Sequence, residues 1–281
     1  MEKIATKAQE VEKSINKKFR AKLWTKFIHA LKDYKLVEEN DKIAVCVSGG
    51  KDSMLLAVLM QMLQRYSDTK FDLVFICMDP GYNEINRKNI EENAKKLEIP
   101  LKFFNSNIFD TVFELDEGSP CYLCARMRRG YLYNEAKKYG CNKIALAHHL
   151  DDVIETTLMG MFHSAQLQGM LPKVRSRNFE GMELIRPLYC VRERDIISWR
   201  DANGLTFIQC ACRFTEQCAE RGQEEPVSMR QETKKLIASL EKEYPNIANH
   251  IFRALHNVNV DTFPAYKQGG KSYDFNDIYE K

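Results

Sequence analysis

Short, almost continuous apolar runs alternate along this chain with segments in which apolar residues recur every three or four positions. The runs predict strands at 43–47, 71–78, 101–104, 143–147 and 182–188, and the periodic segments predict helices near 54–60, 84–97, 121–139, 151–162 and 192–202. Strands that alternate with helices are typical of parallel βαβ units. We therefore expect an α/β fold with a doubly wound, mostly parallel sheet that binds its substrate at the carboxyl ends of the strands.

Both ends of the chain fall outside this alternation. Apolar residues from Ile4 to Leu31 predict a long amphipathic helix, and ten Lys or Arg against four Asp or Glu within 1–35 make its outer face basic. After Pro226 the pattern is helical with a break near Pro245, and a polar, loosely held tail follows. The expected regions are a basic helical segment (1–40), the main α/β domain (41–225), C-terminal helices (226–262) and the tail (263–281).

The composition changes this picture little, because 44% hydrophobic and 29% charged residues are ordinary for a soluble enzyme. No apolar stretch approaches the length of a membrane span, and the first residues lack a signal-peptide core. We therefore expect a cytoplasmic protein with no membrane partner. The nine cysteines then indicate a metal or redox role, since disulfide frameworks are rare in that compartment.

The most informative motif is Ser48-Gly49-Gly50-Lys51-Asp52-Ser53, which lies between a predicted strand and a predicted helix. Such a turn directs backbone N–H groups and the positive end of the helix dipole at an anion, so phosphate is the expected ligand. The glycines allow close approach, Lys51 supplies a positive charge, Asp52 an oxygen ligand for Mg²⁺, and the serines hydroxyl groups. The spacing differs from that of the ATPase P-loop. A generic turn with an unrelated lysine is the alternative.

Further polar residues follow two other predicted strands. Their carboxyl ends should meet the glycine turn at one edge of the sheet. We expect the nucleotide site to include Met78, Asp79, Ala147 and His148. Asp151 and Asp152 open the next helix, where they act either as acid/base groups and a second Mg²⁺ ligand or as helix caps.

The cysteines fall into two groups. Cys121 and Cys124 form a CxxC pair at a predicted helix start, where the dipole stabilises thiolates, and Cys210, Cys212 and Cys218 lie about ninety residues later. Zinc bound by four of these sulfurs and a three-cysteine iron–sulfur cluster both fit the spacing. Four others sit in or beside apolar runs and are expected to be small buried hydrophobes: Cys46, Cys77, Cys141 and Cys190.

Taken in order, these motifs resemble the TtcA family of tRNA 2-thiocytidine synthetases, which are PP-loop proteins of the N-type ATP pyrophosphatase superfamily. The resemblance extends from about residue 20 to residue 260. The matching segments are Ser48–Ser53, Cys121-x-x-Cys124-x-Arg126-x-Arg128-Arg129-Gly130, Ala147-His148-His149-Leu150-Asp151-Asp152, Gly169–Lys173, Ile185-Arg186-Pro187-Leu188 and Arg192-Glu193.

The resemblance implies an ATP- and [4Fe-4S]-dependent tRNA sulfurtransferase. Such an enzyme adenylates cytidine 32 of the anticodon loop and replaces its 2-oxygen with sulfur held on the open iron of the cluster, releasing AMP and pyrophosphate. The implied cluster ligands are Cys121, Cys124 and Cys210. The family pattern Pro-Cys-x-x-Cys-Gly is replaced here by Cys210-Ala211-Cys212-Arg213, so Cys212 is the alternative third ligand. The implied catalytic residues are Lys51, Asp52, Arg128, Asp151 and Asp152.

The implied partners are tRNA and a sulfur donor, expected to be a cysteine desulfurase, and family members commonly form homodimers. The expected contacts to the tRNA backbone are the N-terminal helix, Lys173, Arg175 and Arg177. The altered cysteine region keeps open a thiolase for another tRNA nucleotide or a non-tRNA substrate. A zinc-containing nucleotide-binding protein without sulfur transfer is the third alternative, and a simple amidotransferase-type ligase leaves the CxxC pair unexplained.

Overall fold

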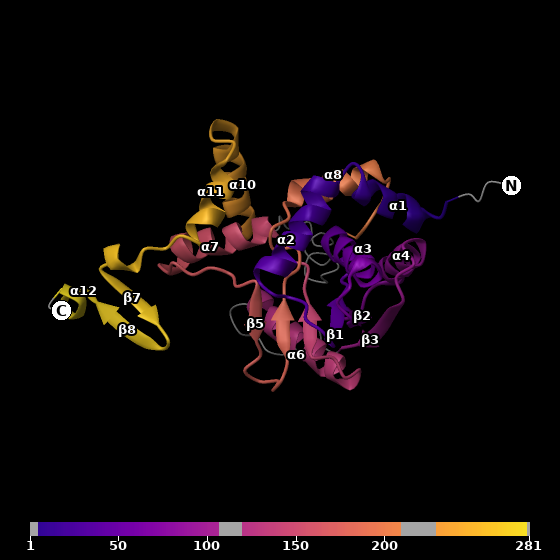
Figure 1. Ribbon diagram of the computed structural model, residues 1–281, viewed down its shortest axis with the longest axis horizontal. Helices are drawn as coiled ribbons and strands as arrows, with labels where there is room; N and C mark the ends of the chain where they lie inside the picture. Colours follow the sequence, from indigo (N-terminus) through magenta and orange to yellow (C-terminus); the bar gives the residue numbers. More distant parts are fainter. Residues whose placement is uncertain (1–4, 107–119, 209–228, 280–281) are drawn as a thin grey trace.

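The computed structural model describes residues 5–106, 120–208 and 229–279, with the backbone alone for residues 120–126 and 278. Its centre is a six-stranded sheet that confirms the expected α/β class (Figure 1). The strands are β1 (Lys42–Cys46), β2 (Asp72–Asp79), β3 (Leu101–Asn105), β4 (Lys143–Ala145), β5 (Lys173–Arg175) and β6 (Glu183–Ile185). β5 was not among the predicted strands, and it pairs with β6 in the antiparallel direction, whereas the other described strand pairs of this sheet are parallel.

The strand order β3-β2-β1-β4-β6-β5 places β1 and β4 side by side at the centre, in parallel. From β1 the chain proceeds outward to β2 and β3, and then returns to β4 on the other side of β1. The connections that leave β1 and β4 therefore diverge at their carboxyl ends. In open α/β sheets a ligand binds in the crevice at such a switch point.

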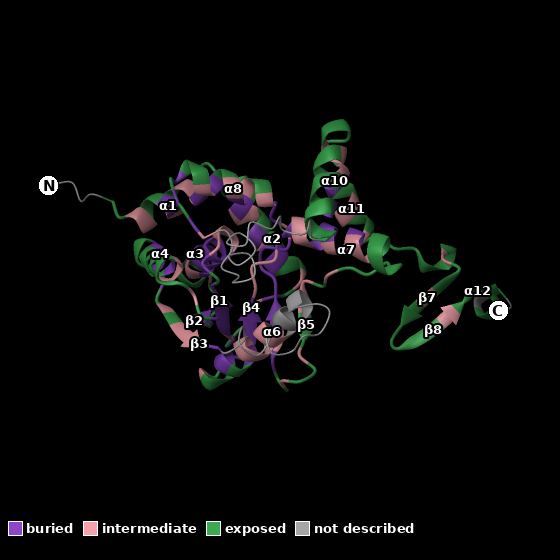
Figure 2. Cartoon of the chain, turned by 180° about the vertical axis from the view of Figure 1, so that it is seen from behind, coloured by how far each residue is buried: buried purple, intermediate pink, exposed green. Residues whose placement is uncertain are grey.

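Successive strand residues face opposite sides of the sheet, and both sides are buried. In β1, Ile43 and Val45 join the larger apolar cluster, whereas Ala44 and Cys46 join a smaller one with Ile144 of β4. Figure 2 shows the buried residues concentrated in the strands and on the inward sides of the helices. Two buried faces explain why the strands read as continuous apolar runs in the sequence.

Helices cover both faces of the sheet. The side of the larger cluster carries α3 (Lys51–Tyr66), α4 (Glu84–Lys96), α8 (Glu193–Ala202) and the N-terminal segment. The other side is covered by α6 (Pro120–Lys138), through Tyr133 and Ala136. At one edge α7 (Leu150–Ser164) packs against α10 (Met229–Glu243) and α11 (Ile247–Ala254) through a third apolar cluster.

The N-terminal segment is helical, but a wider turn interrupts it. The three parts are α1 (Lys7–Asn16), the π-helical η1 (Arg20–Trp24) and α2 (Thr25–Asp33). Its buried residues Val11, Ile15, Phe19, Leu23 and Phe27 are spaced by four, which drifts about 40° per step on a regular helix. The π turn, in which the N–H of Thr25 bonds to the carbonyl five residues back, offsets this drift and returns the stripe to the core.

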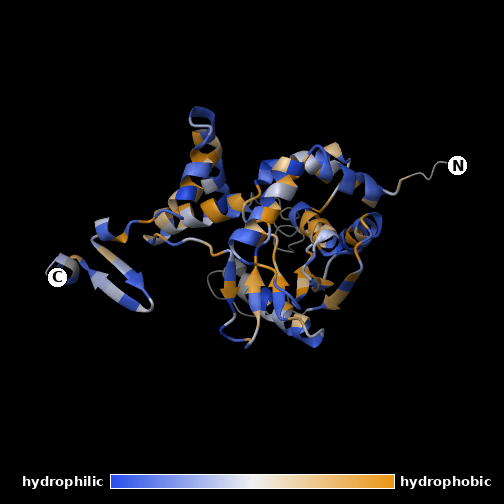
Figure 3. Ribbon diagram, in the orientation of Figure 1, coloured by the Kyte–Doolittle hydropathy of each residue, from blue (hydrophilic) through white to orange (hydrophobic). Residues whose placement is uncertain are grey.

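Regular elements follow α11. The 3-10 turn η2 (Val260–Thr262) precedes the expected polar tail, which contains a hairpin of β7 (Ala265–Gln268) and β8 (Lys271–Asp274), and α12 (Phe275–Tyr279). The hairpin projects beyond α7, away from the sheet, and it carries few strongly hydrophobic residues (Figures 1 and 3). Within the described ranges, no helix has the length and apolarity needed to cross a membrane.

Candidate functional site

The glycine turn lies between β1 and α3, as the sequence predicts. Gly49 has φ +86°, and a Cβ there would lie 2.5 Å from Ile90 and 2.8 Å from Ile208. Both the backbone conformation and the space therefore require glycine at this position. The Ser53 hydroxyl accepts from the backbone N–H of Ser48 at 3.1 Å and donates to the carbonyl of Gly50 at 2.9 Å. These bonds hold the turn that precedes the N-terminus of α3.

Lys51 stands at the start of α3 between two carboxylates. Its Nζ lies 3.0 Å from Oδ2 of Asp52 and 2.9 Å from Oε1 of Glu193, at the start of α8. Burial favours the neutral amine, but the two carboxylates outweigh this effect and raise the pKa of Lys51. The lysine is therefore charged and held beside the glycine turn at the carboxyl edge of the sheet, where it would contact a bound phosphate.

Asp52 presents an oxygen that fits a metal ligand. Its Oδ1 is buried and has no hydrogen-bond partner among the described residues. Nε2 of His149 lies 3.8 Å from it. A buried carboxylate oxygen without a partner is costly, and a hard cation such as Mg²⁺ would satisfy it.

His149 and Asp152 form a reciprocal cap at the start of α7. The N–H of His149 donates to Oδ2 of Asp152 at 3.0 Å, and the N–H of Asp152 donates to Nδ1 of His149 at 3.3 Å. The cap was the structural alternative for Asp152.

His148 comes directly before this cap. Its Nδ1 is buried and has no partner within the described chain, and burial lowers the pKa of His148 to about 4. His148 is therefore a neutral ring at the edge of the crevice.

Asp151 holds the start of α8 instead of facing an open space. Its carboxylate accepts from Nε of Arg192 at 3.0 Å and from the backbone N–H of Glu193 at 2.6 Å. Nη2 of Arg192 continues to Oε1 of Glu241 in α10, at 2.7 Å. The sequence motif contained Arg192 and Glu193 but did not reveal this role, because forty residues separate them from Asp151.

The carboxyl end of β2 is tied into its own turn. Oδ1 of Asp79 accepts from the N–H groups of Gly81 and Tyr82, each at 2.8 Å, and Oδ2 accepts from Arg87 at 2.6 Å. Met78 is buried against residues of α6. Both residues lie beside β1 at the expected edge of the sheet. Asp79 stabilises the turn after β2 through its hydrogen bonds, and Met78 packs against α6.

Two arginines near the crevice bury nitrogen atoms that have no partner in the described part of the chain: Nε of Arg128 in α6 and Nε of Arg186 after β6. Arg186 is 8% exposed, and its Nη1 donates to the carbonyl of Leu171. Burial lowers the pKa of Arg186 to about 10, and the nearby Arg129 adds to this effect. A buried guanidinium in such surroundings favours an anion or a polar base edge.

The helix α10, which sequence reasoning assigned no function, contributes to the same crevice. Nη1 of Arg230 lies 2.9 Å from Asp152 and 3.2 Å from Glu155, and Nζ of Lys234 lies 2.5 Å from Oε2 of Glu193. Burial raises the pKa of Glu155 to about 7, the charge of Asp152 adds to the rise, and Arg230 opposes it. No local motif marks these residues, because each acts only through a distant partner.

The candidate metal ligands can be placed only in part. Cys121 and Cys124 lie in the first turn of α6, which begins at Pro120, so their backbone position is the one predicted. Cys210, Cys212 and Cys218 lie outside the described residues. Thiolates at a helix start suit zinc and iron–sulfur clusters alike. Within the part of the chain that is described, no three His, Cys, Asp or Glu residues form a metal-binding group.

The remaining cysteines behave as the sequence predicted. Cys46, Cys77 and Cys141 are free and buried, and Cys190 is half-buried. Burial raises the pKa of Cys77 to about 12 and the pKa values of Cys141 and Cys190 to about 11. These thiols therefore pack as small apolar groups in the two clusters that flank the sheet.

Two of the expected tRNA contacts lie away from the crevice. Arg175 pairs with Glu183 at the amino end of β6, and the chain continues from there to Arg177 at the opposite edge of the sheet from the glycine turn. Lys173 bonds to the carbonyl of Lys35 at 2.8 Å. The structure therefore does not bring this basic segment to the site.

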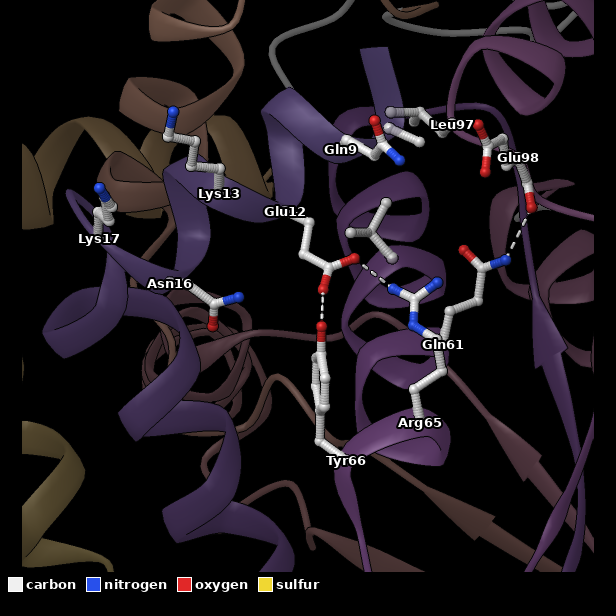
Figure 4. A pocket seen from close by; sticks show the side chains of 12 residues that line it. Gln9, Glu12, Lys13, Asn16, Lys17, Gln61, Arg65, Tyr66, Leu97 and Glu98 are labelled. Carbon is white, nitrogen blue, oxygen red and sulfur yellow. Dashed lines mark hydrogen bonds and ion pairs between the residues drawn. The ribbon is translucent and has the colours of Figure 1, made fainter. Parts of the chain in front are cut away.

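A polar groove between α1 and α3 is also remote from the glycine turn, because it lies at the other end of α3 (Figure 4). There Glu12 accepts hydrogen bonds from Arg65 and Tyr66, and Gln61 bonds to the carbonyl of Glu98 at 2.8 Å. The bonds to Glu12 attach the N-terminal helix to α3, and the bond of Gln61 attaches α3 to the turn that follows α4.

Known proteins share both the sequence and the fold. Residues 17–213 match the PP-loop domain. The tRNA-cytidine(32) 2-sulfurtransferase of Aliivibrio fischeri is 33% identical over 276 residues, which cover 97% of this chain and 84% of that protein. The enzyme of the same name from Geobacter metallireducens is 36% identical over 231 residues, which cover 82% and 86%.

Among solved structures, the U34-tRNA thiolase NcsA from Methanococcus maripaludis, determined with its [4Fe-4S] cluster, superposes with a TM-score of 0.64. The match covers 83% of this chain and 77% of that protein, at 20% sequence identity. At this identity the match establishes a shared fold.

Proposed function

Because the chain belongs to the PP-loop family of tRNA-cytidine(32) 2-sulfurtransferases, we propose that it is an ATP-dependent tRNA sulfurtransferase whose target is cytidine 32. The observation that carries the proposal is the group of residues at the carboxyl ends of β1 and β4. There the glycine turn, the charged Lys51 and the unpartnered oxygen of Asp52 meet at the switch point of the sheet. This arrangement supports binding of a nucleotide polyphosphate together with a divalent cation.

The proposed role of the crevice is to activate the cytidine by adenylation. The turn and Lys51 bind the phosphates and stabilise the charge that develops on pyrophosphate as it leaves. Asp52 holds Mg²⁺ through the oxygen that no described residue satisfies. Neutral His148, beside Ala147, borders the nucleotide. The carbonyl oxygen of the base thereby becomes part of a phosphate ester and departs as AMP.

The proposed second centre lies at the start of α6. Cys121 and Cys124 hold a [4Fe-4S] cluster together with a third cysteine, Cys210 or Cys212, and α6 stabilises their thiolates. When bound, the cluster supplies the activated sulfur. Arg128 lies one turn after Cys124 and buries an Nε that has no partner among the described residues, so it is the proposed contact to the substrate. A cysteine desulfurase is the proposed sulfur source and a homodimer the proposed assembly.

The geometry changes the proposed roles of the acidic pair. Asp152 caps α7 and Asp151 orders the start of α8, so we propose that both position the site rather than transfer protons. For tRNA binding, Arg128 and Arg186 at the crevice are better placed than Arg175 and Arg177 at the opposite edge. Arg186 is the proposed contact for an RNA phosphate beside the target base.

Expression in a bacterial strain that has lost its own tRNA-cytidine(32) 2-sulfurtransferase tests the proposal. Nucleoside analysis of the tRNA should show 2-thiocytidine with the wild-type chain and none with Lys51→Ala. Recovery of a different thiolated nucleoside would indicate the alternative of another tRNA target. A soluble wild-type protein that restores no thiolated nucleoside, and binds zinc but no iron, would favour the nucleotide-binding protein without sulfur transfer.

A further inference from the structure

One carboxylate, that of Glu193, lies between two lysines that come from opposite parts of the chain. Its Oε1 is 2.9 Å from Nζ of Lys51, and its Oε2 is 2.5 Å from Nζ of Lys234. Burial opposes ionisation of Glu193, but the two ammonium groups outweigh this effect and lower its pKa to about 2. The place between the two lysines therefore strongly favours an anion.

The helix that carries Lys234 is fixed against the site on the same face. Arg230 and Glu241, four residues before and seven after Lys234, pair with α7 and α8, and such spacings share one face of a helix with about 3.6 residues per turn. Ile237 is buried between them. The backbone of Lys234 is thus held in place, while its side chain remains 53% exposed and free to reorient.

The ammonium of Lys51 lies at the turn proposed to bind phosphate, and there it donates to the carboxylate of Glu193. A phosphate oxygen and a carboxylate oxygen accept the same charge-assisted hydrogen bonds from an ammonium group. When a polyphosphate enters the crevice, both lysines can therefore exchange this carboxylate for phosphate oxygens at little cost. The exchange needs no movement of α3 or α10, since only the ends of flexible side chains change partners.

We infer that Lys234 completes the polyphosphate subsite from the C-terminal helix and binds the β- or γ-phosphate of ATP opposite Lys51. The inference rests on the ATP site of the proposed function and adds a residue outside the part of the chain that matches the PP-loop domain. Glu193 keeps the two lysines in place until the nucleotide binds. Glu193 thus positions the two lysines without contacting the nucleotide, whereas Lys234 binds the phosphate directly.

A purely structural role for Lys234, as one of the ion pairs that attach α10, predicts a different outcome. Such a role would affect stability and would weaken all nucleotides alike. A contact to the terminal phosphates affects ATP and leaves AMP unchanged. Lys235 provides a matched control, because it is the same residue type on the same helix and is exposed on another face.

The test is calorimetric titration of the full-length protein with Mg·ATP and with AMP, without tRNA, for wild type, Lys234→Ala, Lys234→Arg and Lys235→Ala. Lys234→Ala should weaken ATP binding about tenfold and leave AMP binding unchanged, because a charge-assisted hydrogen bond is lost. Lys234→Arg should recover most of the affinity, and Lys235→Ala should match wild type. Melting temperatures of all four proteins check the fold.

Equal affinities of wild type and Lys234→Ala for ATP would overturn the inference, and so would an equal loss for ATP and AMP. Neither result affects the proposed function, because the wild-type chain would still bind ATP. A folded wild-type protein that binds no ATP at all would contradict the ATP site itself, and the inference with it. The two failures are therefore distinguishable within one data set.

Discussion

Nε of Arg192 lies 3.0 Å from Oδ1 of Asp151, so the first turns of α7 and α8 are joined across the carboxyl edge of the sheet. The other oxygen of Asp151 accepts from the N–H of Glu193, whose side chain reaches Lys51. Asp151 therefore orients Lys51 through Glu193, although it does not touch the lysine.

Replacing Asp151 by Asn should destabilise the protein by about 2 kcal/mol, because Arg192 loses a charged partner in a buried position. The KM for ATP should rise, and the shape of the pH profile of kcat should not change. Thermal melting and steady-state kinetics measure both effects. Asp201→Asn, at an exposed carboxylate paired with its neighbour Arg200, is the matched control. If Asp151→Asn keeps its stability but loses one limb of the pH profile, Asp151 is an acid/base group after all.

Substitutions in the proposed ATP site and in the proposed cluster site should each abolish the function of one site and leave the other intact. Lys51→Ala should lower the rate of pyrophosphate release by about 10²–10³ and retain iron, since Lys51 stabilises charge on the departing pyrophosphate. Cys121→Ala should lose iron and retain ATP binding. Iron and sulfide analysis after anaerobic purification, together with ATP titration, separates the two. Full iron content and full thiolation in Cys121→Ala would rule out Cys121 as a cluster ligand.

Gly49→Ala and Gly140→Ala form a matched pair of substitutions. Both glycines have positive φ, +86° and +71°, so each alanine should cost about 1–2 kcal/mol of backbone strain. Only Gly49 has side chains where the Cβ would lie, those of Ile90 and Ile208, whereas nothing lies within 4 Å at Gly140. Gly49→Ala should therefore lower the melting temperature further and abolish ATP binding. Equal losses in the two variants, with ATP binding intact, would contradict the close packing of the turn.

Glu155 should make the stability pH-dependent. Its pKa is about 7 in the folded chain, against an ordinary value of 4.5, so between these values the folded state binds more protons than the unfolded state. Stability from this group is thus present below pH 4.5 and is lost as the pH rises to about 7. Glu155→Gln should melt higher than wild type at pH 8, and the difference should shrink toward pH 4.5.

Urea unfolding across this pH range measures the effect, with the exposed Glu243→Gln as a control. A difference between Glu155→Gln and wild type that stays constant with pH would show that folding does not raise the pKa of Glu155. The variant should also retain ATP binding, because Glu155 lies one turn behind the cap formed by His149 and Asp152.

The sequence predicts those parts of the site that lie next to one another in the chain. Ser48–Ser53 combines a fixed spacing with an apolar strand before it, and two buried faces make that strand continuous in the sequence. The break at η1 was not foreseen, because a stripe spaced by four looks helical whether or not the helix stays regular. β5 was missed for a similar reason, since it has only three residues and its exposed edge is charged.

The electrostatic partners could not be predicted. Asp151 and Arg192, or Lys51 and Glu193, meet only because β1, β4 and β6 are neighbours in the sheet, and no local pattern encodes that order. The role of Lys234 is still harder to predict from the sequence, since its helix shows only an ordinary amphipathic pattern. The same limit explains why Asp151 and Asp152 read as catalytic candidates: adjacent carboxylates at a strand end look alike whether they bind substrate or cap a helix.

We propose above that this chain thiolates cytidine 32 and converts ATP to AMP and pyrophosphate in the same reaction. The most direct measurement incubates the anaerobically purified protein with Mg·ATP, sulfide and a tRNA transcript that carries either cytidine or uridine at that position. We expect 2-thiocytidine in the first transcript only, with one AMP formed for each sulfur inserted. Equal thiolation of both transcripts, or no thiolation by an iron-loaded, ATP-binding protein, would contradict it.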